Sequence, residues 1–198
     1  MRKLKFTTLL LCAALALAPS ISCGNGSKSA SLSKNPTNSD QQENNPNIGN
    51  NEVKVNMSEE ANENETVFKL NSVTHAEVQD DKDRHFIYLN VTIKNDTNES
   101  YNLSSLNNFY LILPDGTEVY SSIRTAYSAN KFFDESEIFA DPFEIPANGE
   151  FTGYINGFEI PDGTEKFTIG FFPTKENQND KETVIKIDIT PDMITQAT

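Results

Sequence analysis

The chain has 198 residues, with 16 basic side chains against 29 acidic ones and a formal net charge of −13 at neutral pH. Nucleic acids and anionic lipid surfaces attract proteins through clusters of Lys and Arg, so this acidic balance excludes both as expected electrostatic partners. The two cysteines, Cys12 and Cys23, lie near the N-terminus, and Cys12 falls in a segment that we expect to be removed. We therefore expect no disulfide to support the fold.

Residues 1–22 have the pattern of a secretory signal. Basic Arg2, Lys3 and Lys5 precede an apolar run from Phe6 to Pro19. A membrane-spanning helix needs about 20 apolar residues, and this run is shorter. Its length and its basic flank predict a signal peptide over residues 1–22 that the mature protein lacks.

The residues around Cys23 predict a lipid anchor. Ser20-Ile21-Ser22-Cys23 resembles the lipobox of bacterial lipoproteins, in which the cysteine takes a diacylglycerol and becomes the new N-terminus, although Ser20 replaces the usual Leu, Val or Ile. Two fatty-acid chains, such as palmitate, give lasting attachment, because each buried methylene contributes about 0.8 kcal/mol. The alternative is ordinary cleavage near Pro19, which would release a soluble protein with a free thiol. The lipoprotein interpretation places the protein on the outer face of the bacterial cytoplasmic membrane, anchored through Cys23.

A polar segment over residues 23–64 follows the signal. It is rich in Asn, Ser, Glu, Gln, Lys and Gly, with isolated apolar residues that include Val53, Val55 and Met57. Such a composition does not bury enough apolar surface to offset the entropy of ordering. We expect a disordered tether that spans about 35 Å on average and leads to a folded domain over residues 65–198.

From residue 65 onward, short apolar segments alternate with turns. In the clearest of them, residues 86–94, the side chains of Ile87, Leu89, Val91 and Ile93 share one face, and this period of two predicts a half-buried strand. Similar segments cover residues 67–73, 109–113, 151–160, 167–171 and 184–189, and the turns Pro114-Asp115-Gly116 and Pro161-Asp162-Gly163 punctuate them. No segment has a sustained helical period. The sequence therefore predicts an all-β fold, a single antiparallel β-sandwich of the immunoglobulin type.

The order of several motifs resembles a known family. The motifs are residues 88–95, Leu103-Ser104-Ser105 before Phe109 and Leu111, the turn at residues 114–116, residues 145–150, Gly153-Tyr154-Ile155 and Phe158-Glu159-Ile160-Pro161. This series resembles the telokin-like, immunoglobulin-like domain of unknown function found on many Gram-positive lipoproteins, over about residues 67–172. The resemblance implies a secreted or lipid-anchored β-sandwich in a Gram-positive envelope, without established catalytic residues.

A long stretch over residues 121–141 departs from that family pattern. It carries Tyr127, Phe132, Phe133 and Phe139 among acidic residues. Aromatic side chains interleaved with polar ones on a loop can form an interaction patch, so these four are the candidate interaction residues. The alternative is that the rings close one end or edge of the sandwich, because large aromatic side chains are usually buried.

Candidate metal ligands and catalytic groups are few. His75 and His85 flank an acidic turn that contains Asp81 and Asp83, and paired strands would bring these side chains together. Their spacing matches neither a zinc site with converging ligands nor a calcium loop, so these four are weak candidates and we expect no metal. A Gly-x-Ser-x-Gly nucleophile motif is also absent from the sequence. We expect no catalytic residues, no cofactor and no enzymatic activity.

These features predict a lipid-anchored extracytoplasmic surface protein. Its immunoglobulin-like domain would bind a protein or a polymer of the envelope or the host, through residues 121–141 and an exposed strand edge. The alternative is a small-ligand or metal-binding lipoprotein associated with a transporter. Receptors of that kind usually enclose their ligand in a cleft between two lobes, and a single domain leaves little room for one.

Overall fold

The computed structural model describes residues 48–78, 81–175 and 181–197. They belong to a compact unit that spans residues 43–198. The predicted signal peptide, Cys23 and the predicted tether up to residue 47 lie outside the described residues. Among the residues that are described, no helix is both long enough and apolar enough to cross a membrane.

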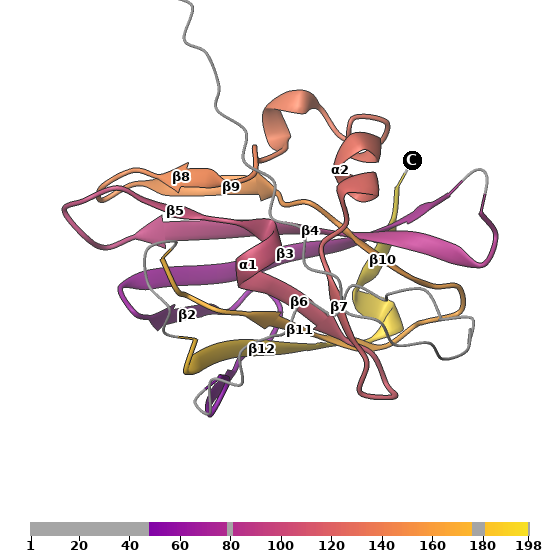
Figure 1. The fold of residues 1–198 in the computed structure, drawn as a ribbon, viewed down its shortest axis with the longest axis horizontal. Helices are drawn as coiled ribbons and strands as arrows, with labels where there is room; N and C mark the ends of the chain where they lie inside the picture. The colour runs from indigo at the N-terminus through magenta and orange to yellow at the C-terminus, as the bar shows by residue number, and fades with distance from the viewer. Residues whose placement is uncertain (1–47, 79–80, 176–180, 198) are drawn as a thin grey trace, which may run out of the picture. The chain divides into compact units, whose positions relative to one another are not determined.

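Two sheets pack face to face, and this β-sandwich confirms the predicted all-β class (Figure 1). Within the described residues sheet A has five strands, in the spatial order β1 (Asn51–Lys54), β12 (Thr183–Ile189), β11 (Phe167–Phe171), β6 (Phe109–Ile112) and β7 (Glu118–Tyr120). Sheet B has six strands within the described residues, and four of them follow the spatial order β10 (Phe158–Pro161), β4 (Arg84–Asn95), β3 (Thr66–Glu77) and β13 (Ile194–Gln196). The other two are β2 (Glu60–Glu63), which pairs with β3, and β9 (Glu150–Tyr154), which pairs with β4. The remaining elements are the paired strands β5 (Tyr101–Leu103) and β8 (Phe143–Ile145), the helices α1 (Ser105–Asn108) and α2 (Ile123–Ala129), and the 3-10 turns η1 (Glu135–Glu137) and η2 (Pro191–Met193).

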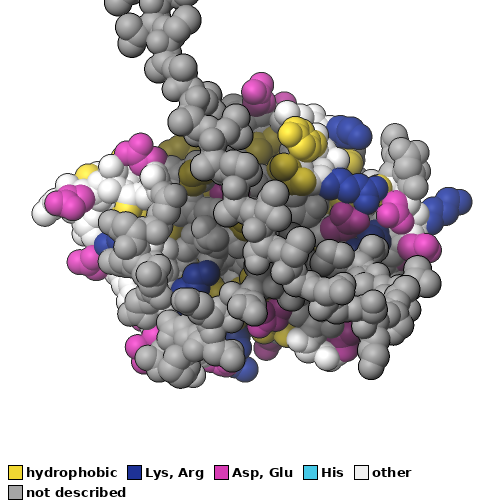
Figure 2. All heavy atoms as spheres, in the orientation of Figure 1, with side chains coloured by type: hydrophobic (Ala, Val, Ile, Leu, Met, Phe, Trp, Pro, Cys, Tyr) yellow, Lys and Arg dark blue, Asp and Glu magenta, His cyan; other side chains and the backbone are white. Residues whose placement is uncertain are grey.

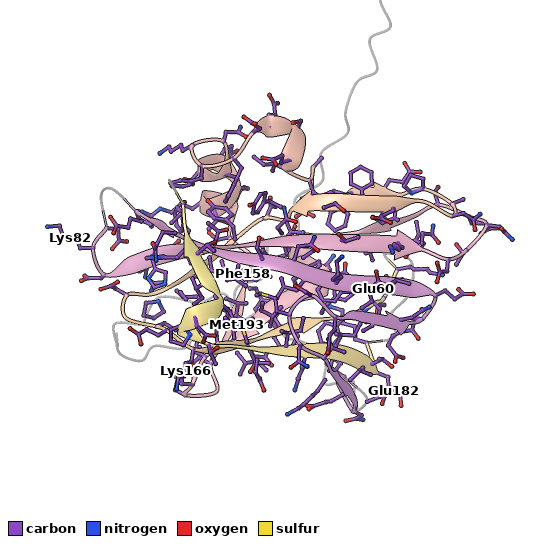
Figure 3. All side chains as sticks on the ribbon, turned by 180° about the vertical axis from the view of Figure 1, so that it is seen from behind. Glu60, Lys82, Phe158, Lys166, Glu182 and Met193 are labelled. Atoms are coloured by element: carbon purple, nitrogen blue, oxygen red, sulfur yellow. The ribbon has the colours of Figure 1, made fainter. Side chains whose placement is uncertain are left out.

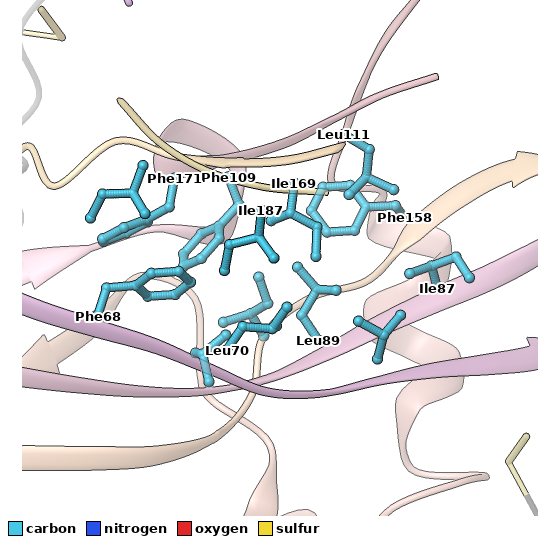
Figure 4. Packing of buried hydrophobic residues seen from close by; sticks show 14 of the residues in the cluster. Phe68, Leu70, Ile87, Leu89, Phe109, Leu111, Phe158, Ile169, Phe171 and Ile187 are labelled. Carbon is cyan, nitrogen blue, oxygen red and sulfur yellow. The ribbon is translucent and has the colours of Figure 1, made fainter. Parts of the chain in front are cut away.

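The main core lies between the two sheets and centres on three phenylalanines (Figure 4). The ring of Phe68 in β3 stacks on Phe171 in β11 with 4.4 Å between centroids, and Phe109 in β6 lies 4.7 Å from Phe171. All three side chains are at most 1% exposed. The chain has no tryptophan, so these phenylalanines supply the large aromatic surface that joins the sheets.

The clearest predicted strand is confirmed as β4, and its inner face is buried as expected. Ile87 and Leu89 are both fully buried in the main core. The outer face is also covered in part, because Tyr88 is fully buried and its ring lies 5.1 Å from that of Phe133. The segment that follows β7 therefore forms a third layer over one end of sheet B.

The predicted strand over residues 151–160 is divided into β9 and β10 by a close approach at Gly157. A Cβ atom at this position would lie 2.7 Å from the carbonyl oxygen of Ile87, so a side chain would force the two strands apart. The carbonyl of Gly157 accepts hydrogen bonds from the Ser122 backbone N at 3.1 Å and from Thr125 Oγ1 at 2.8 Å. The break in the strand thus positions the start of α2.

The prediction of a disordered tether is wrong for residues 51–54 and 60–63, and a domain start at residue 65 is wrong for the same reason. Strand β1 pairs with β12, and β2 pairs with β3. Val53, Val55 and Met57 pack against the main core, and Ala61 is buried. Their spacing of two residues is a strand pattern, and the polar residues between them face outward, which accounts for the polar composition.

Two outer strand pairs depart from the predicted antiparallel arrangement. Strand β1 runs parallel to β12, and β13 runs parallel to β3. Parallel neighbours need a long connection, and each of these pairs joins segments that are far apart in the sequence. The other pairings between the named strands are antiparallel.

The packing of β1 on the core can be tested with one substitution. Val53→Ser should lower the free energy of unfolding by about 1 kcal/mol, because the side chain is half-buried against the core. Lys54→Ser, at the exposed position next to it, should have little effect. Urea unfolding of residues 23–198 carrying Cys23→Ser would measure both. If the Val53→Ser variant and its parent have the same free energy of unfolding, residues 51–54 do not pack on the core and belong to the tether.

Candidate functional site

Residues 121–141 form α2, a turn and η1, where the sequence predicted a loop. Helix α2 begins after Ser122, whose hydroxyl accepts a hydrogen bond from the backbone N of Arg124 at 3.2 Å. Tyr88 in β4 donates its buried hydroxyl to the carbonyl of Thr125 at 2.9 Å. Burial raises the pKa of the Tyr88 hydroxyl, which keeps it protonated as a donor. The helix is therefore fixed against sheet B (Figure 1).

The four candidate interaction aromatics do not form one exposed patch. Phe139 is 5% exposed and stacks on Phe143 at 4.7 Å, so it belongs to the core. Phe132 and Phe133 are half-buried against Tyr88, and Phe133 also stacks on Tyr154 at 3.7 Å. The alternative expectation rested on the burial of large aromatic side chains, and these three rings are buried or half-buried. Their burial removes water from large apolar surfaces.

Tyr127 and a residue that the sequence analysis missed form the exposed part of this segment. Tyr127 is 80% exposed, and Ile123, one helical turn earlier in α2, is 74% exposed. Residues four apart lie on the same side of a helix, so these two apolar side chains form a short stripe. The four-residue spacing of Ile123 and Tyr127 was the sequence signal that could have identified this stripe. It was missed because α2 has seven residues, which is too few to show a sustained helical period.

A groove lies beside this stripe, between α2 and the adjacent ends of β3, β4 and β13. Its volume is about 660 Å³, and Phe86 and Phe132 contribute apolar surface to it. Arg124 and Lys131 line it on the side of α2, and Glu77 lines it from β3. Hydrophobic and basic side chains lie next to each other over this part of the molecule (Figure 2). The α2 surface, defined as Ile123, Tyr127 and this groove, combines apolar area with positive charge.

Arg124 links α2 to the sandwich through several contacts. Its guanidinium donates a hydrogen bond to Glu159 at 2.9 Å and lies 3.5 Å from the carboxylate of Asp81. It also lies 5.6 Å from the ring centroid of Phe86, in a cation–π arrangement. Asp81 is thus engaged with α2. Lys131, by contrast, has no ion-pair partner within the described residues, so its charge faces the groove and solvent.

The two histidines are neighbours, as paired strands would require. Strands β3 and β4 bring the rings of His75 and His85 to a centroid distance of 4.1 Å. The predicted acidic partners are elsewhere, because Asp81 contacts Arg124 and Asp83 lies in the exposed turn. Asp162 takes their place, with Oδ1 at 3.7 Å from Nδ1 of His85. Among the described residues, no three His, Cys, Asp or Glu side chains are gathered as a metal-ligand set.

The environment of His85 favours its neutral form. Burial lowers the pKa of His85, the adjacent His75 ring lowers it further, and Asp162 opposes both effects. Nδ1 of His85 and Nε2 of His75 are buried without a hydrogen-bond partner in the described structure. They lie at a cavity of about 270 Å³ that the β10–β11 turn and the C-terminal segment also line. Figure 3 shows this side of the molecule, with the C-terminal segment that follows Met193.

Comparison with known proteins identifies a domain family. The model of the family described as "Domain of unknown function (DUF4352)" matches residues 43–181. This match begins before residue 65, in agreement with the presence of β1 and β2 in the fold. No curated protein matches the chain. An unknown-function β-sandwich domain is therefore confirmed, while the telokin-like resemblance and the lipoprotein signal stay predictions.

Three of the solved structures to which the chain is similar come from Bacillus subtilis and Clostridium difficile. The Bacillus subtilis protein ycdA, described as a candidate lipoprotein, is 20% identical with a TM-score of 0.49, over 69% of this chain and 39% of its own. The Bacillus subtilis protein yjhA is 17% identical with a TM-score of 0.45, over 67% of this chain and 98% of its own. An uncharacterized β-sandwich protein from Clostridium difficile is 16% identical with a TM-score of 0.41, over 70% and 95%. The chain thus spans about two fifths of the ycdA chain.

Proposed function

Since the chain belongs to the DUF4352 family, whose description names no activity, we propose a function from its own residues. We propose that it is a lipid-anchored extracytoplasmic module that binds a protein of the cell envelope or the host through the α2 surface. The observation that carries this proposal is the exposed pair Ile123 and Tyr127 on a helix that is fixed to the sandwich.

The location rests on the N-terminal sequence. A basic start, a short apolar run and the lipobox-like residues before Cys23 support export and lipid attachment. The polar segment after Cys23 supports a tether, which the fold shortens to residues 23–47 at most. A tether of about 25 residues of this composition would span about 28 Å on average, enough to hold the domain away from the lipid headgroups.

A protein partner fits the α2 surface better than a polymer of sugars or anionic groups does. Exposed Ile123 and Tyr127 provide the apolar and aromatic contacts that are enriched at protein interfaces. Lys131 places a positive charge beside them on an otherwise acidic protein. The complementary partner segment therefore presents an apolar side chain next to a carboxylate.

The helix does not need to fold on binding. Its first turn is capped by Ser122, and its backbone is held by the Tyr88 hydroxyl. A surface that is already in its binding conformation avoids the entropic cost of ordering a loop. This rigidity supports α2, rather than a flexible loop, as the element that contacts the partner.

The double substitution Ile123→Ser and Tyr127→Ser should abolish partner capture without unfolding the domain, because both side chains are mostly exposed. The assay immobilises residues 23–198 with Cys23→Ser, exposes them to envelope extract, and quantifies each bound protein by mass spectrometry. A specific partner should lose at least about tenfold in enrichment, which corresponds to about 1.4 kcal/mol.

Leu106→Ser is the matched control for this assay. Leu106 is 55% exposed on α1, a separate helix, and it does not line the groove. A protein that binds the parent and the Leu106→Ser variant equally, and is lost from the double variant, supports the proposal. If every bound species is retained by the double variant, or if the bound material is envelope polysaccharide, the proposal fails.

A binding role without catalysis remains part of this proposal. The alternative expectation, a small-ligand or metal-binding lipoprotein that serves a transporter, has one supporting observation in the adjacent rings of His75 and His85. The adjacent histidine rings give no evidence for association with a transporter, so we keep protein binding as the proposed function.

A further inference from the structure

The rings of His75 and His85 are packed against each other on strands β3 and β4. Their centroids are 4.1 Å apart, and the ring planes meet at 73°. His85 is 6% exposed, and the buried atoms Nε2 of His75 and Nδ1 of His85 have no hydrogen-bond partner among the described residues. A protonated imidazole carries two N–H donors, so a proton on His85 would place a charge and an unsatisfied donor beside the second ring. The folded state therefore favours neutral His85.

The carboxylates near His85 give a proton on this ring little compensation. Oδ1 of Asp162 lies 3.7 Å from Nδ1 of His85, which is beyond hydrogen-bond distance. The Asp162 side chain is 68% exposed, so solvent screens its charge. Glu165 lines the same cavity from the turn between β10 and β11. Both carboxylates belong to this turn, and neither is hydrogen-bonded to the ring.

Other charged groups surround His85 on the strands and on the C-terminal segment. Glu77 is opposite His85 in the register of β3 and β4, and Arg84 precedes it on β4. Glu159 on β10 is 3.9 Å from the guanidinium of Arg84. Asp192 in η2 is exposed and does not line the cavity. The C-terminal segment therefore covers the histidine pair with uncharged residues only.

The C-terminal segment is held to the sandwich by few contacts (Figure 3). Strand β13 has three residues and lies at the margin of sheet B, on β3. The backbone N of Ala197 donates a hydrogen bond to the carbonyl of His75 at 2.8 Å. Met193 and Ile194 are half-buried against the core, and Ile194 and Gln196 line the same cavity of about 270 Å³ as the two rings. A short segment with little buried apolar surface opens at a low free energy.

From this arrangement we propose that protonation of His85 releases the C-terminal segment, residues 191–197, from β3. Opening gives water access to the two rings, so the open form accepts a proton that the closed form resists. Gln196 and Ala197 also line the groove beside α2, and release removes this wall of the groove. The effect on the groove matters for partner binding only if the proposed function is correct. The release itself does not depend on that function.

The sign of the pH dependence follows from the environment of His85. Burial and the His75 ring lower the pKa of His85 from its ordinary value of about 6.5, so the open form binds a proton at a higher pH than the closed form. Above about pH 6.5 this ring is neutral in both forms, and the closed form has its full stability. As the pH falls from about 6.5 toward the pKa of the closed form, the equilibrium constant for opening should rise by up to about tenfold per pH unit.

Amide exchange at Ala197 measures this opening constant. NMR follows the exchange in residues 23–198 carrying Cys23→Ser, and the rates are corrected for intrinsic exchange at each pH. His85→Gln retains a polar side chain that does not titrate, so it should remove the pH dependence. Asp162→Asn removes the carboxylate that opposes the effect of burial, so it should strengthen the dependence at low pH. Asp83→Asn, in the exposed neighbouring turn, is the matched control and should change nothing.

Three outcomes would overturn the proposal. The first is an opening constant at Ala197 that does not change with pH in the parent, or that changes equally in the His85→Gln variant. The second is an equal opening constant at Ile169, in the middle of sheet A, because the whole domain would then be unfolding. The third is a response confined to the amide of Asp162, which donates to the carbonyl of Asp83 at 2.8 Å, because the turn would then be the element released. The parent and the Asp162→Asn variant decide the matter even if His85→Gln does not fold.

Discussion

Phe171→Ala should lower the free energy of unfolding by about 3–5 kcal/mol, the usual cost of removing a buried phenylalanine. The ring is fully buried and contacts both Phe68 and Phe109, so its loss leaves a cavity at the junction of β3, β6 and β11. Because a domain of this size is stable by about 5–15 kcal/mol, a large share of the stability would be lost.

Urea unfolding followed by circular dichroism measures this effect, and Phe151→Ala provides the control. Phe151 is also a phenylalanine in a strand, β9, but it is 41% exposed. Its replacement should cost clearly less than that of Phe171. Similar losses for the two variants would mean that the aromatic cluster does not hold the sheets together.

Cys23→Ser should abolish the incorporation of fatty acid into the protein when it is expressed in a bacterium. The sulfur of Cys23 is the acceptor in the proposed lipid attachment, and serine offers no thiol. Cys12→Ser is the matched control, because Cys12 lies within the predicted signal peptide and should leave lipidation unchanged. Labelling of cells with radioactive palmitate would measure both variants.

Mass spectrometry of the mature N-terminus distinguishes the two processing routes. The lipoprotein route gives a chain that begins at Cys23 and carries a diacylglyceryl group. Cleavage near Pro19 gives an unmodified chain that starts about three residues earlier and keeps its thiol. Detection of the second product, or equal palmitate label on the Cys23→Ser variant, would remove the anchor from the proposed function.

The strands of the main core were predictable because their side chains follow the period of a half-buried sheet. Ile87 and Leu89 face the core as the alternation required, and β11 has the predicted bounds of residues 167–171. Both Pro-Asp-Gly turns are also present, with Gly116 and Gly163 at φ values of 85° and 74°. These features depend on neighbouring residues, so the local sequence contains the information.

The outer parts of the fold depend on contacts that local patterns do not encode. Val53 lies among polar residues, and its burial requires β12, which is more than 100 positions away in the sequence. The division of the sequence-predicted strand at Gly157 likewise requires the carbonyl of Ile87 to lie close by. Composition therefore suggested disorder, and periodicity suggested one continuous strand.

The histidine pair and the α2 surface were predictable only in part, because each also depends on contacts between segments that are distant in the sequence. The proximity of His75 and His85 follows from strand pairing, but Asp162 reaches them from a separate turn. In residues 121–141, counting aromatic residues did not separate exposed Tyr127 from buried Phe139. Tyr127 lies on the exposed side of α2, whereas Phe139 follows η1 and stacks on Phe143, and these tertiary placements are not encoded in the local sequence.

The short outer strands have a consequence for crowding on a surface. Sheet A is bounded by β1 and β7, of four and three residues, and β13 at the margin of sheet B has three. Aggregation between sheets needs a long run of unpaired backbone groups, and strands this short offer few of them. Copies concentrated side by side should therefore resist joining edge to edge, and each should remain a separate particle at high density.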